Sequence, residues 1–312
     1  MYLTRNGYEL PIQHIYIHKR IGIIMQNNTP DYESLTYNPS ECDHDTMLKM
    51  SKSSFMLYNQ CPRKYWWNYI ALPDIRPPPT EAMVRGTQIH KTMETLIYDP
   101  TDEKTVSETV KVADEEGVKD DDGFNVMLEL MVDLESQIGK YEVLSSEIKL
   151  TVYDETKDMW LVGAMDGLIQ TEDGKVILVE LKTGNFSDSK LSRTRLELCF
   201  YAYMIERTPL PRPTHFLYIA PDACNEKTLN KLMNQKRKLV GMGLTQGLWM
   251  LEKISLRSLN TFVKKYNNAV FCLKNADFPL KWNEFYCSQY CDYMIQCEPE
   301  MNGVIPDPTI EL

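Results

Sequence analysis

The spacing of hydrophobic residues changes several times along this chain of 312 residues, and each change predicts a different element. Residues 1–45 show little periodicity, so we expect an N-terminal extension there, forming at most a short hairpin or a partly ordered arm. Helical spacing begins at Ser53, a favourable N-cap, and continues to about Ile70. A proline-rich break over 74–79 separates this helix from a second one predicted over 82–96.

The central part of the chain changes to the alternating pattern of strands. The acidic residues 101–123 indicate a loop-like insertion, and helical spacing returns over 124–141. The remaining predicted elements are strands at 143–153, 159–170, 175–182 and 214–220, and helices at 194–206, 226–240 and 255–274. Strands grouped between helices predict an α/β fold, with a mixed central sheet flanked by helices.

Two acidic residues and a lysine stand near the ends of two predicted strands. Residues 163–184 indicate two strands joined by the polar turn 171–175, which is a hairpin signal. Because side chains alternate along a strand, Glu180 and Lys182 project to the same side, and Asp166 on the neighbouring strand can approach Glu180. Two carboxylates and a lysine form an oxygen-rich site suited to Mg²⁺ or Mn²⁺ and to phosphodiester hydrolysis.

A cross-strand ion pair on a solvated sheet face would explain the same residues without catalysis. The nearly continuous apolar run over 176–179 favours the metal site, because it predicts a strand that is buried on both faces. Glu180 and Lys182 at the end of such a strand are costly to bury unless a metal ion compensates them.

The composition, 43% hydrophobic and 25% charged, is typical of a soluble globular protein. No apolar stretch is long enough to cross a bilayer, and the first 25 residues lack the apolar centre of a secretion signal, so we expect a cytoplasmic protein. The net charge of −10 is concentrated in residues 101–140, which hold 12 acidic and 4 basic residues. Basic groups elsewhere are either phosphate contacts or solvated helix faces. They are Arg63-Lys64, Arg193 with Arg195, Lys236-Arg237-Lys238 and Lys264-Lys265.

Three of the eight cysteines, Cys287, Cys291 and Cys297, fall within eleven residues. Without a secretion signal a disulfide framework is not expected, and clustered cysteines then favour a metal site. Cys61 is the candidate fourth ligand of a site for Zn²⁺ or an iron–sulfur cluster. The alternative is that these cysteines are small buried hydrophobes. Burial in the core is the default for the other four, which are Cys42, Cys199, Cys224 and Cys272.

Six segments occur in the order found in a known family. They are residues 51–55 running into 61–66, residues 85–87 with 89–90, residues 163–167, residues 180–184, residues 196–203, and the C-terminal cysteine triplet. Together they resemble the RecB-like branch of the PD-(D/E)XK nuclease superfamily over about residues 50–300. More narrowly, they are similar to its iron–sulfur members, which are the CRISPR-associated RecB-like exonucleases, the exonuclease V group and the AddB nuclease domain.

The resemblance implies a restriction-endonuclease-like sheet with helical additions, and a role for each matching residue. Lys182 would assist the attacking water, and Tyr201 would help to position DNA. The implied ligands of the Mg²⁺ or Mn²⁺ ion are His90, Asp166, Glu180 and the carbonyl of Leu181. The implied ligands of a structural [4Fe–4S] cluster, which would clasp the C-terminal tail to the first helix, are Cys61, Cys287, Cys291 and Cys297. Zn²⁺ is the alternative occupant of this four-cysteine site.

Two positions depart from the family pattern. Glu197 stands where the family has glutamine, and we expect it to pair with Arg193 or Arg195. Three residues separate Cys287 from Cys291, where the family commonly has two.

The sequence therefore predicts a nuclease domain over 46–300, with an acidic insertion at about 100–123 and a tail at 301–312. The favoured function is a metal-dependent DNA nuclease, acting as an exonuclease on single-stranded DNA. Its partners would be DNA and proteins of recombination and repair, replication or CRISPR adaptation, with no membrane contact. Two other functions are open: a non-cleaving DNA-binding module of the same fold, and a Zn-stabilised interaction protein whose carboxylates form surface pairs.

Overall fold

The computed structural model describes residues 34–37, 48–73, 78–222, 224, 226–233, 238–243 and 247–303. The extension predicted over 1–45 lies outside the described residues, apart from one short strand at Ser34–Tyr37. The tail also lies outside them beyond residue 303. The described residues form a mixed α/β structure, as the sequence predicted.

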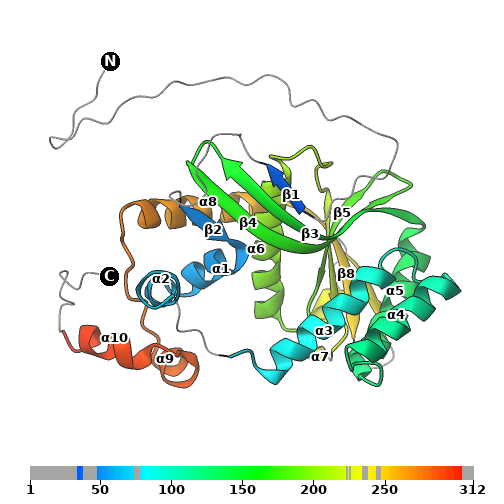
Figure 1. Cartoon of the computed structure of the whole chain (residues 1–312), viewed down its shortest axis with the longest axis horizontal. Helices are drawn as coiled ribbons and strands as arrows, with labels where there is room; N and C mark the ends of the chain where they lie inside the picture. The colour runs from blue at the N-terminus through cyan, green and yellow to red at the C-terminus, as the bar shows by residue number, and fades with distance from the viewer. Residues whose placement is uncertain are drawn as a thin grey trace, which may run out of the picture. The chain divides into compact units, whose positions relative to one another are not determined.

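The described strands form one mixed sheet in the order β1-β3-β4-β5-β6-β8-β7, with β2 paired to β4 (Figure 1). Strand β4 is antiparallel to both β3 and β5, whereas β5 and β6 are parallel. The parallel pair requires a crossover connection, which helix α6 provides. The strands are β1 (Ser34–Tyr37), β2 (Lys49–Ser51), β3 (Tyr141–Asp154), β4 (Met159–Thr171), β5 (Val176–Leu181), β6 (His215–Ala220), β7 (Lys238–Met242) and β8 (Leu248–Lys253).

Helices cover both faces of the sheet (Figure 1). On one face α1, α6 and α8 bury Phe55, Phe200 and Phe262, whose rings contact one another. On the other face α3 and α5 bury Ile89 and Phe124. The helices are α1 (Lys52–Gln60), α2 (Pro62–Trp66), the π-helical turn η1 (Trp67–Ala71), α3 (Glu81–Leu96), α4 (Glu103–Glu115), α5 (Asp122–Ile138), α6 (Asp188–Ile205), α7 (Glu226–Met233), α8 (Leu256–Lys274), α9 (Glu284–Tyr290) and α10 (Met294–Met301).

Strand β5 is buried along its whole length, as its apolar run predicted. Val176 and Leu178 belong to the core on the α6 side, whereas Ile177 and Val179 belong to the core on the α3 side. This burial follows from the helices on both faces of the sheet. The same alternation directs Glu180 toward the α6 side.

Two glycines let helices approach the strand ends. A Cβ atom added at Gly86 in α3 would lie 2.9 Å from Oγ1 of Thr183, which follows β5. A Cβ atom added at Gly163 in β4 would lie 2.7 Å from the ring of Tyr201 in α6. Both distances are shorter than van der Waals contact, so larger residues at these positions would push the helices away from the strands.

The loop predicted at 101–123 is wrong, because residues 103–115 of this segment form α4. Its N-cap Asp102 accepts a hydrogen bond from the N–H of Thr105 at 2.8 Å. The helix buries only Thr109 and Ala113, which makes its apolar stripe narrow. The acidic composition of the segment led to the loop prediction, although apolar residues recur within it at helical spacing, at Val106, Val110 and Ala113.

Two further boundaries differ from the predictions. The helix predicted over 226–240 ends at Met233, and Lys238 begins strand β7, which pairs with the unpredicted strand β8. The first helix is capped by Ser51 and not by Ser53, since the Ser51 hydroxyl accepts a hydrogen bond from the N–H of Ser54. Within the described ranges, no helix combines the length and the apolar character that crossing a membrane requires.

Candidate active site

The β4–β5 hairpin brings Asp166 beside Glu180. The turn between the strands closes as predicted, around Gly174 with a φ of 81°. Gly167 pairs with Val179 across the two strands. The ladder ends at this pair, and Asp166 and Glu180 are the next residues on the two strands.

Each carboxylate oxygen of Asp166 has a partner. Oδ2 accepts a hydrogen bond from the N–H of Leu181 at 2.6 Å, and Oδ1 lies 3.2 Å from Nδ1 of His90 on α3. Burial opposes ionisation of Asp166, but His90, Lys182 and the Leu181 N–H outweigh it and lower its pKa. Asp166 is therefore a negatively charged carboxylate at neutral pH, held in a fixed orientation.

Glu147 on β3 joins this pair, although no sequence pattern assigned it a role. One ligand atom from each of His90, Glu147 and Asp166 lies within 4.8 Å of the other two. Glu147 has a φ of 50°, a strained conformation that costs about 1–3 kcal/mol and is typical of functional sites. Burial, followed by the charges of Asp166 and Glu94, raises the pKa of Glu147 to about 7. A cation placed among these groups would relieve their repulsion.

Glu180 is only 2% exposed. Its Oε1 accepts a hydrogen bond from Nζ of Lys182 at 2.5 Å, whereas Oε2 has no hydrogen-bond partner among the described residues. Burial raises the pKa of Glu180, and the nearby charges of Asp166 and Glu197 raise it further against the opposing effect of Lys182. A buried carboxylate oxygen without a donor is costly, and an added cation would satisfy it.

Glu197 of α6 is surrounded by cations. Its Oε2 lies 2.7 Å from Nζ of Lys182 and 3.6 Å from Nζ of Lys52, and its Oε1 lies 3.4 Å from Nε of Arg193. The pairing with Arg193 is one of the two that the sequence predicted. Burial would lower the pKa of Lys182, but the carboxylates of Glu180, Glu197 and Asp166 outweigh burial and raise it. Lys182 is therefore a cation and a hydrogen-bond donor at neutral pH, and not a general base.

Tyr201 binds the backbone of β4 next to the carboxylate cluster. Its hydroxyl donates a hydrogen bond to the carbonyl of Ala164, two residues before Asp166. Its side chain is fully buried, and Nζ of Lys52 lies 5.5 Å from the ring centroid. Tyr201 thus fixes the β4 backbone beside the carboxylates.

The donor set fits a hard divalent cation, because it offers several carboxylate oxygens, one imidazole and one buried oxygen without a donor. The structure brings together the predicted residues His90, Asp166, Glu180 and Lys182. The tightest group of ligand atoms contains Glu147 in place of Glu180, whose Oε1 is bound by Lys182. Sequence reasoning missed Glu147 and Lys52. For Glu147, the signal available was a glutamate inside a strand of alternating apolar and polar residues.

The four predicted cysteines come together from two ends of the chain. Cys61 lies between α1 and α2, Cys287 and Cys291 lie in and directly after α9, and Cys297 lies in α10, all as free thiols. Burial raises the pKa of Cys291 and of Cys297, and neighbouring thiols, Cys61 among them, raise both further. In the described part of the chain, no three of these sulfurs lie within 4.8 Å of one another. Ligands of a single Zn²⁺ ion would lie closer, since Zn–S bonds are about 2.3 Å long.

Side-chain contacts hold the C-terminal helices against α2 and η1. Arg63 and Lys64, which the sequence offered as phosphate contacts, are both used in this way. The contacts are an Arg63–Glu300 ion pair at 2.7 Å, a Lys64–Asp292 ion pair at 3.1 Å, a hydrogen bond from Nε1 of Trp67 to Sγ of Cys297 at 3.3 Å, and one from the Tyr293 hydroxyl to Oδ1 of Asn68 at 3.1 Å.

Comparison with known proteins identifies the superfamily of this chain. The sequence model of the PD-(D/E)XK nuclease superfamily matches residues 49–298, and the chain therefore belongs to this superfamily. Its members are nucleases that typically use a divalent metal ion. Among solved structures, the chain is similar to one described as "Crystal structure of SSO0001", with 13% sequence identity and a TM-score of 0.36 over 83% of this chain and 88% of that chain. The search of curated proteins found no match.

Proposed function

We propose that this protein is a metal-dependent DNA nuclease that hydrolyses single-stranded DNA as an exonuclease. The observation that carries the proposal is the carboxylate cluster, in which the half-buried His90, Glu147 and Asp166 converge while Oε2 of the buried Glu180 has no donor within the described chain. Buried carboxylates that serve stability alone are normally satisfied by the protein's own donors. Membership of the nuclease superfamily supports nucleic acid as the substrate.

Each residue of the cluster would have a distinct task. A bound Mg²⁺ or Mn²⁺ ion supplies Lewis acidity and a water molecule of lowered pKa. Asp166, Glu147 and His90 would hold the ion, and Glu180 and the Leu181 carbonyl would complete its oxygen ligands. The N–H of Leu181 keeps Asp166 in its orientation. The second oxygen of Asp166 then stays directed toward His90.

Lys182 would act as a charged donor. Because its ammonium remains protonated, it can donate to the attacking water or to a phosphate oxygen and stabilise the negative charge that develops there. Glu180 and Glu197 hold this ammonium from two sides. Tyr201 would position the reacting groups indirectly, through its hydrogen bond to the Ala164 carbonyl.

We also propose that the four cysteines hold a structural [4Fe–4S] cluster. Their thiols are free and lie near one another, and the resemblance to the iron–sulfur nucleases supports this occupant. The cluster would strengthen the clasp that the ion pairs of Arg63 and Lys64 already form. Zn²⁺ is the alternative occupant.

Cleavage of end-labelled single-stranded DNA tests the nuclease proposal. We expect degradation with Mg²⁺ or Mn²⁺, none with EDTA, and a severe loss in the Lys182→Ala variant. Intact DNA under every metal condition would overturn the proposal and favour the non-cleaving DNA-binding module. Circular single-stranded DNA, which has no ends, is the control that separates exonuclease from endonuclease activity. If circles are cut as fast as linear strands, the exonuclease assignment is overturned.

Iron content and visible absorbance of anaerobically purified protein test the cluster. The wild type should be brown with four iron atoms per chain for a [4Fe–4S] cluster. Cys291→Ala should lose colour, stability and DNA affinity together, whereas Cys272→Ala, which removes a thiol from the core, should keep its iron. Colourless protein that contains zinc would overturn the cluster in favour of Zn²⁺.

A further inference from the structure

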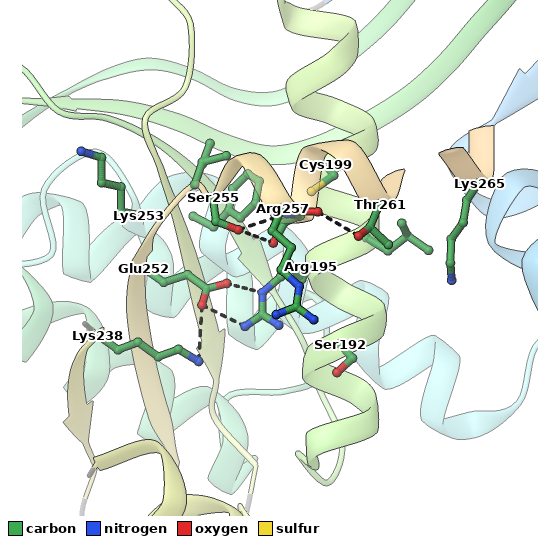
Figure 2. Close-up of a pocket in the computed structure, with 14 residues that line it drawn as sticks. Ser192, Arg195, Cys199, Lys238, Glu252, Lys253, Ser255, Arg257, Thr261 and Lys265 are labelled. Carbon is green, nitrogen blue, oxygen red and sulfur yellow. Dashed lines mark hydrogen bonds and ion pairs between the residues drawn. The ribbon is translucent and has the colours of Figure 1, made fainter. Parts of the chain in front are cut away.

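A strongly basic cavity lies between α6, α8 and the strands β6 to β8. Its volume is about 890 Å³, within the range of roughly 300–1,000 Å³ that is typical of ligand sites. Six charged side chains line it, and five of them are cations, in a chain whose net charge is −10. These residues are Arg195, Lys238, Lys253, Arg257, Lys265 and the single carboxylate Glu252 (Figure 2).

Basic groups that are far apart in the sequence meet in this cavity. Arg195, Lys238 and Lys265 belong to three of the local basic groups that the sequence left open between phosphate contacts and solvated helix faces. Their convergence from α6, β7 and α8 is not expected of unrelated solvated faces. A focused positive potential of this kind attracts phosphate groups.

Glu252 fixes two of the cations. Arg195 donates to both of its oxygens at 2.6 and 2.8 Å, and Lys238 lies 3.3 Å from Oε2 (Figure 2). The hydroxyl of Tyr218 donates to Oε1 at 2.6 Å, so the carboxylate is fully engaged. The other three cations are exposed and make no ion pair with the described residues; they are Lys253, Arg257 and Lys265.

The rest of the lining suits a nucleotide more than a bare anion. Hydroxyl groups surround the cations, and the first turn of α8, with its N-cap Ser255, adds the positive end of the helix dipole. Phosphate oxygens can accept hydrogen bonds from these groups, while the sugar and base can contact apolar atoms. The hydroxyl residues are Ser192, Ser255, Ser258 and Thr261, and the apolar residues are Leu196, Cys199, Phe216 and Ile254.

Helix α6 carries the cavity and the carboxylate cluster on nearly opposite sides. Arg193, Glu197 and Tyr201 recur every four residues and serve the cluster. Ser192, Arg195 and Cys199 belong to another stripe, which lines the cavity. Because a helix is about 10–12 Å across, a strand that occupies both places has to cross α6.

We propose that this cavity is a phosphate-binding subsite for the single strand on which the nuclease acts, holding nucleotides on the other side of α6 from the bond that is cleaved. This inference rests on the proposed function, from which the DNA substrate is taken. The location of the subsite is taken from the basic lining of the cavity. The recognised chemistry is the phosphodiester backbone, and the contacts to it carry no sequence preference.

Binding of fluorescently labelled single-stranded DNA to the full chain in EDTA, followed by anisotropy over a range of salt concentrations, tests the subsite. The double variant Arg257→Ala/Lys265→Ala removes two exposed cations from the cavity. Its control, Lys104→Ala/Lys111→Ala, removes two exposed lysines from α4. Each phosphate contact to a single strand contributes about 0.7 to the salt slope, so the cavity variant should lose about 1.4 in slope and about 25-fold in affinity at about 0.1 M salt.

Loss of affinity in the cavity variant alone supports the subsite, and equal affinity of the two double variants overturns it. Competition with thymidine monophosphate and with inorganic phosphate separates a strand from a free anion. If the cavity variant loses only the binding of these small anions and binds DNA like the control, the strand assignment is overturned. Because binding is measured without metal ions, a failed cleavage assay would overturn the nuclease proposal and leave the subsite standing.

Discussion

Asp154 and Glu180 are buried carboxylates in the same sheet, and only the site of Asp154 is complete. Asp154, at the end of β3, is fully buried and accepts hydrogen bonds from the hydroxyls of Tyr203 at 2.7 Å, Thr156 at 2.7 Å and Tyr266 at 3.1 Å. Glu180, at the end of β5, is 2% exposed and leaves one oxygen without a donor among the described residues.

We interpret this difference as one of role: Asp154 stabilises the fold, whereas Glu180 contributes to a ligand site. Burial opposes ionisation of Asp154, but Tyr203, Thr156 and Arg207 outweigh it and lower its pKa. The pKa of Glu180 is instead raised, by burial and by its acidic neighbours. A folded chain tolerates buried charge where donors or an opposite charge compensate it, so we propose that the incomplete site is the one that binds a cation.

The largest effect should follow Asp166→Asn, which removes the charge at nearly constant size. Single-turnover cleavage of single-stranded DNA should fall at least about a thousandfold, because several kcal/mol of transition-state stabilisation depends on the ion that Asp166 would hold. The thermal midpoint should stay near that of the wild type, since the substitution also removes repulsion from Glu147. Normal cleavage by this variant would show that the site is assigned wrongly.

Lys182→Ala should have the next largest effect. Removal of one charged donor to the reacting groups typically costs about 10²–10³ in rate. Lys52→Ala is the matched comparison, because Lys52 lies farther from Glu180, at 3.7 Å against 2.5 Å for Lys182. The same assay should therefore show a clearly smaller loss for Lys52→Ala, and equal losses would contradict a special role for Lys182.

Asp154→Asn should change stability and not cleavage. We expect a loss of about 3 kcal/mol in the free energy of unfolding, because the hydroxyls of Tyr203, Thr156 and Tyr266 lose their charged acceptor. The lowered pKa of Asp154 means that its stabilisation is fully present above about pH 4 and is lost as pH falls through the folded-state pKa. Urea unfolding should thus give a large difference from the wild type at neutral pH and a smaller one in acid, and a difference independent of pH would contradict this role.

Glu197→Gln should have the smallest effect, less than about tenfold in cleavage. The amide oxygen can still accept a hydrogen bond from Lys182, which is worth about 1 kcal/mol. A loss as large as that of Lys182→Ala would instead show that the negative charge of Glu197 is required.

The sequence alone predicted the part of the site that rests on regular alternation. The hairpin around Gly174 and the buried run of β5 placed Asp166, Glu180 and Lys182 correctly relative to one another. The hairpin and the buried run depend on local periodicity, which a single sequence displays. His90 came instead from the resemblance to the nuclease family.

The remainder depends on contacts between distant segments. Glu147 lies in the cluster with a strained backbone conformation, which no residue pattern predicts. Lys52 reaches Glu197 because α1 and α6 lie against each other in the core. Arg195 and Lys265 line the same basic cavity because α6 and α8 pack against each other. Such features become visible when the tertiary structure is known.

Calorimetric titration with Mn²⁺ tests the central claim, that the incomplete acidic cluster is a cation site, most directly. The wild type and Asp154→Asn should bind Mn²⁺ with similar affinity and gain thermal stability from it, whereas Asp166→Asn should bind at least about tenfold more weakly, a difference of about 1.4 kcal/mol. Equal Mn²⁺ affinity in all three proteins, or no binding to the wild type, would contradict the claim.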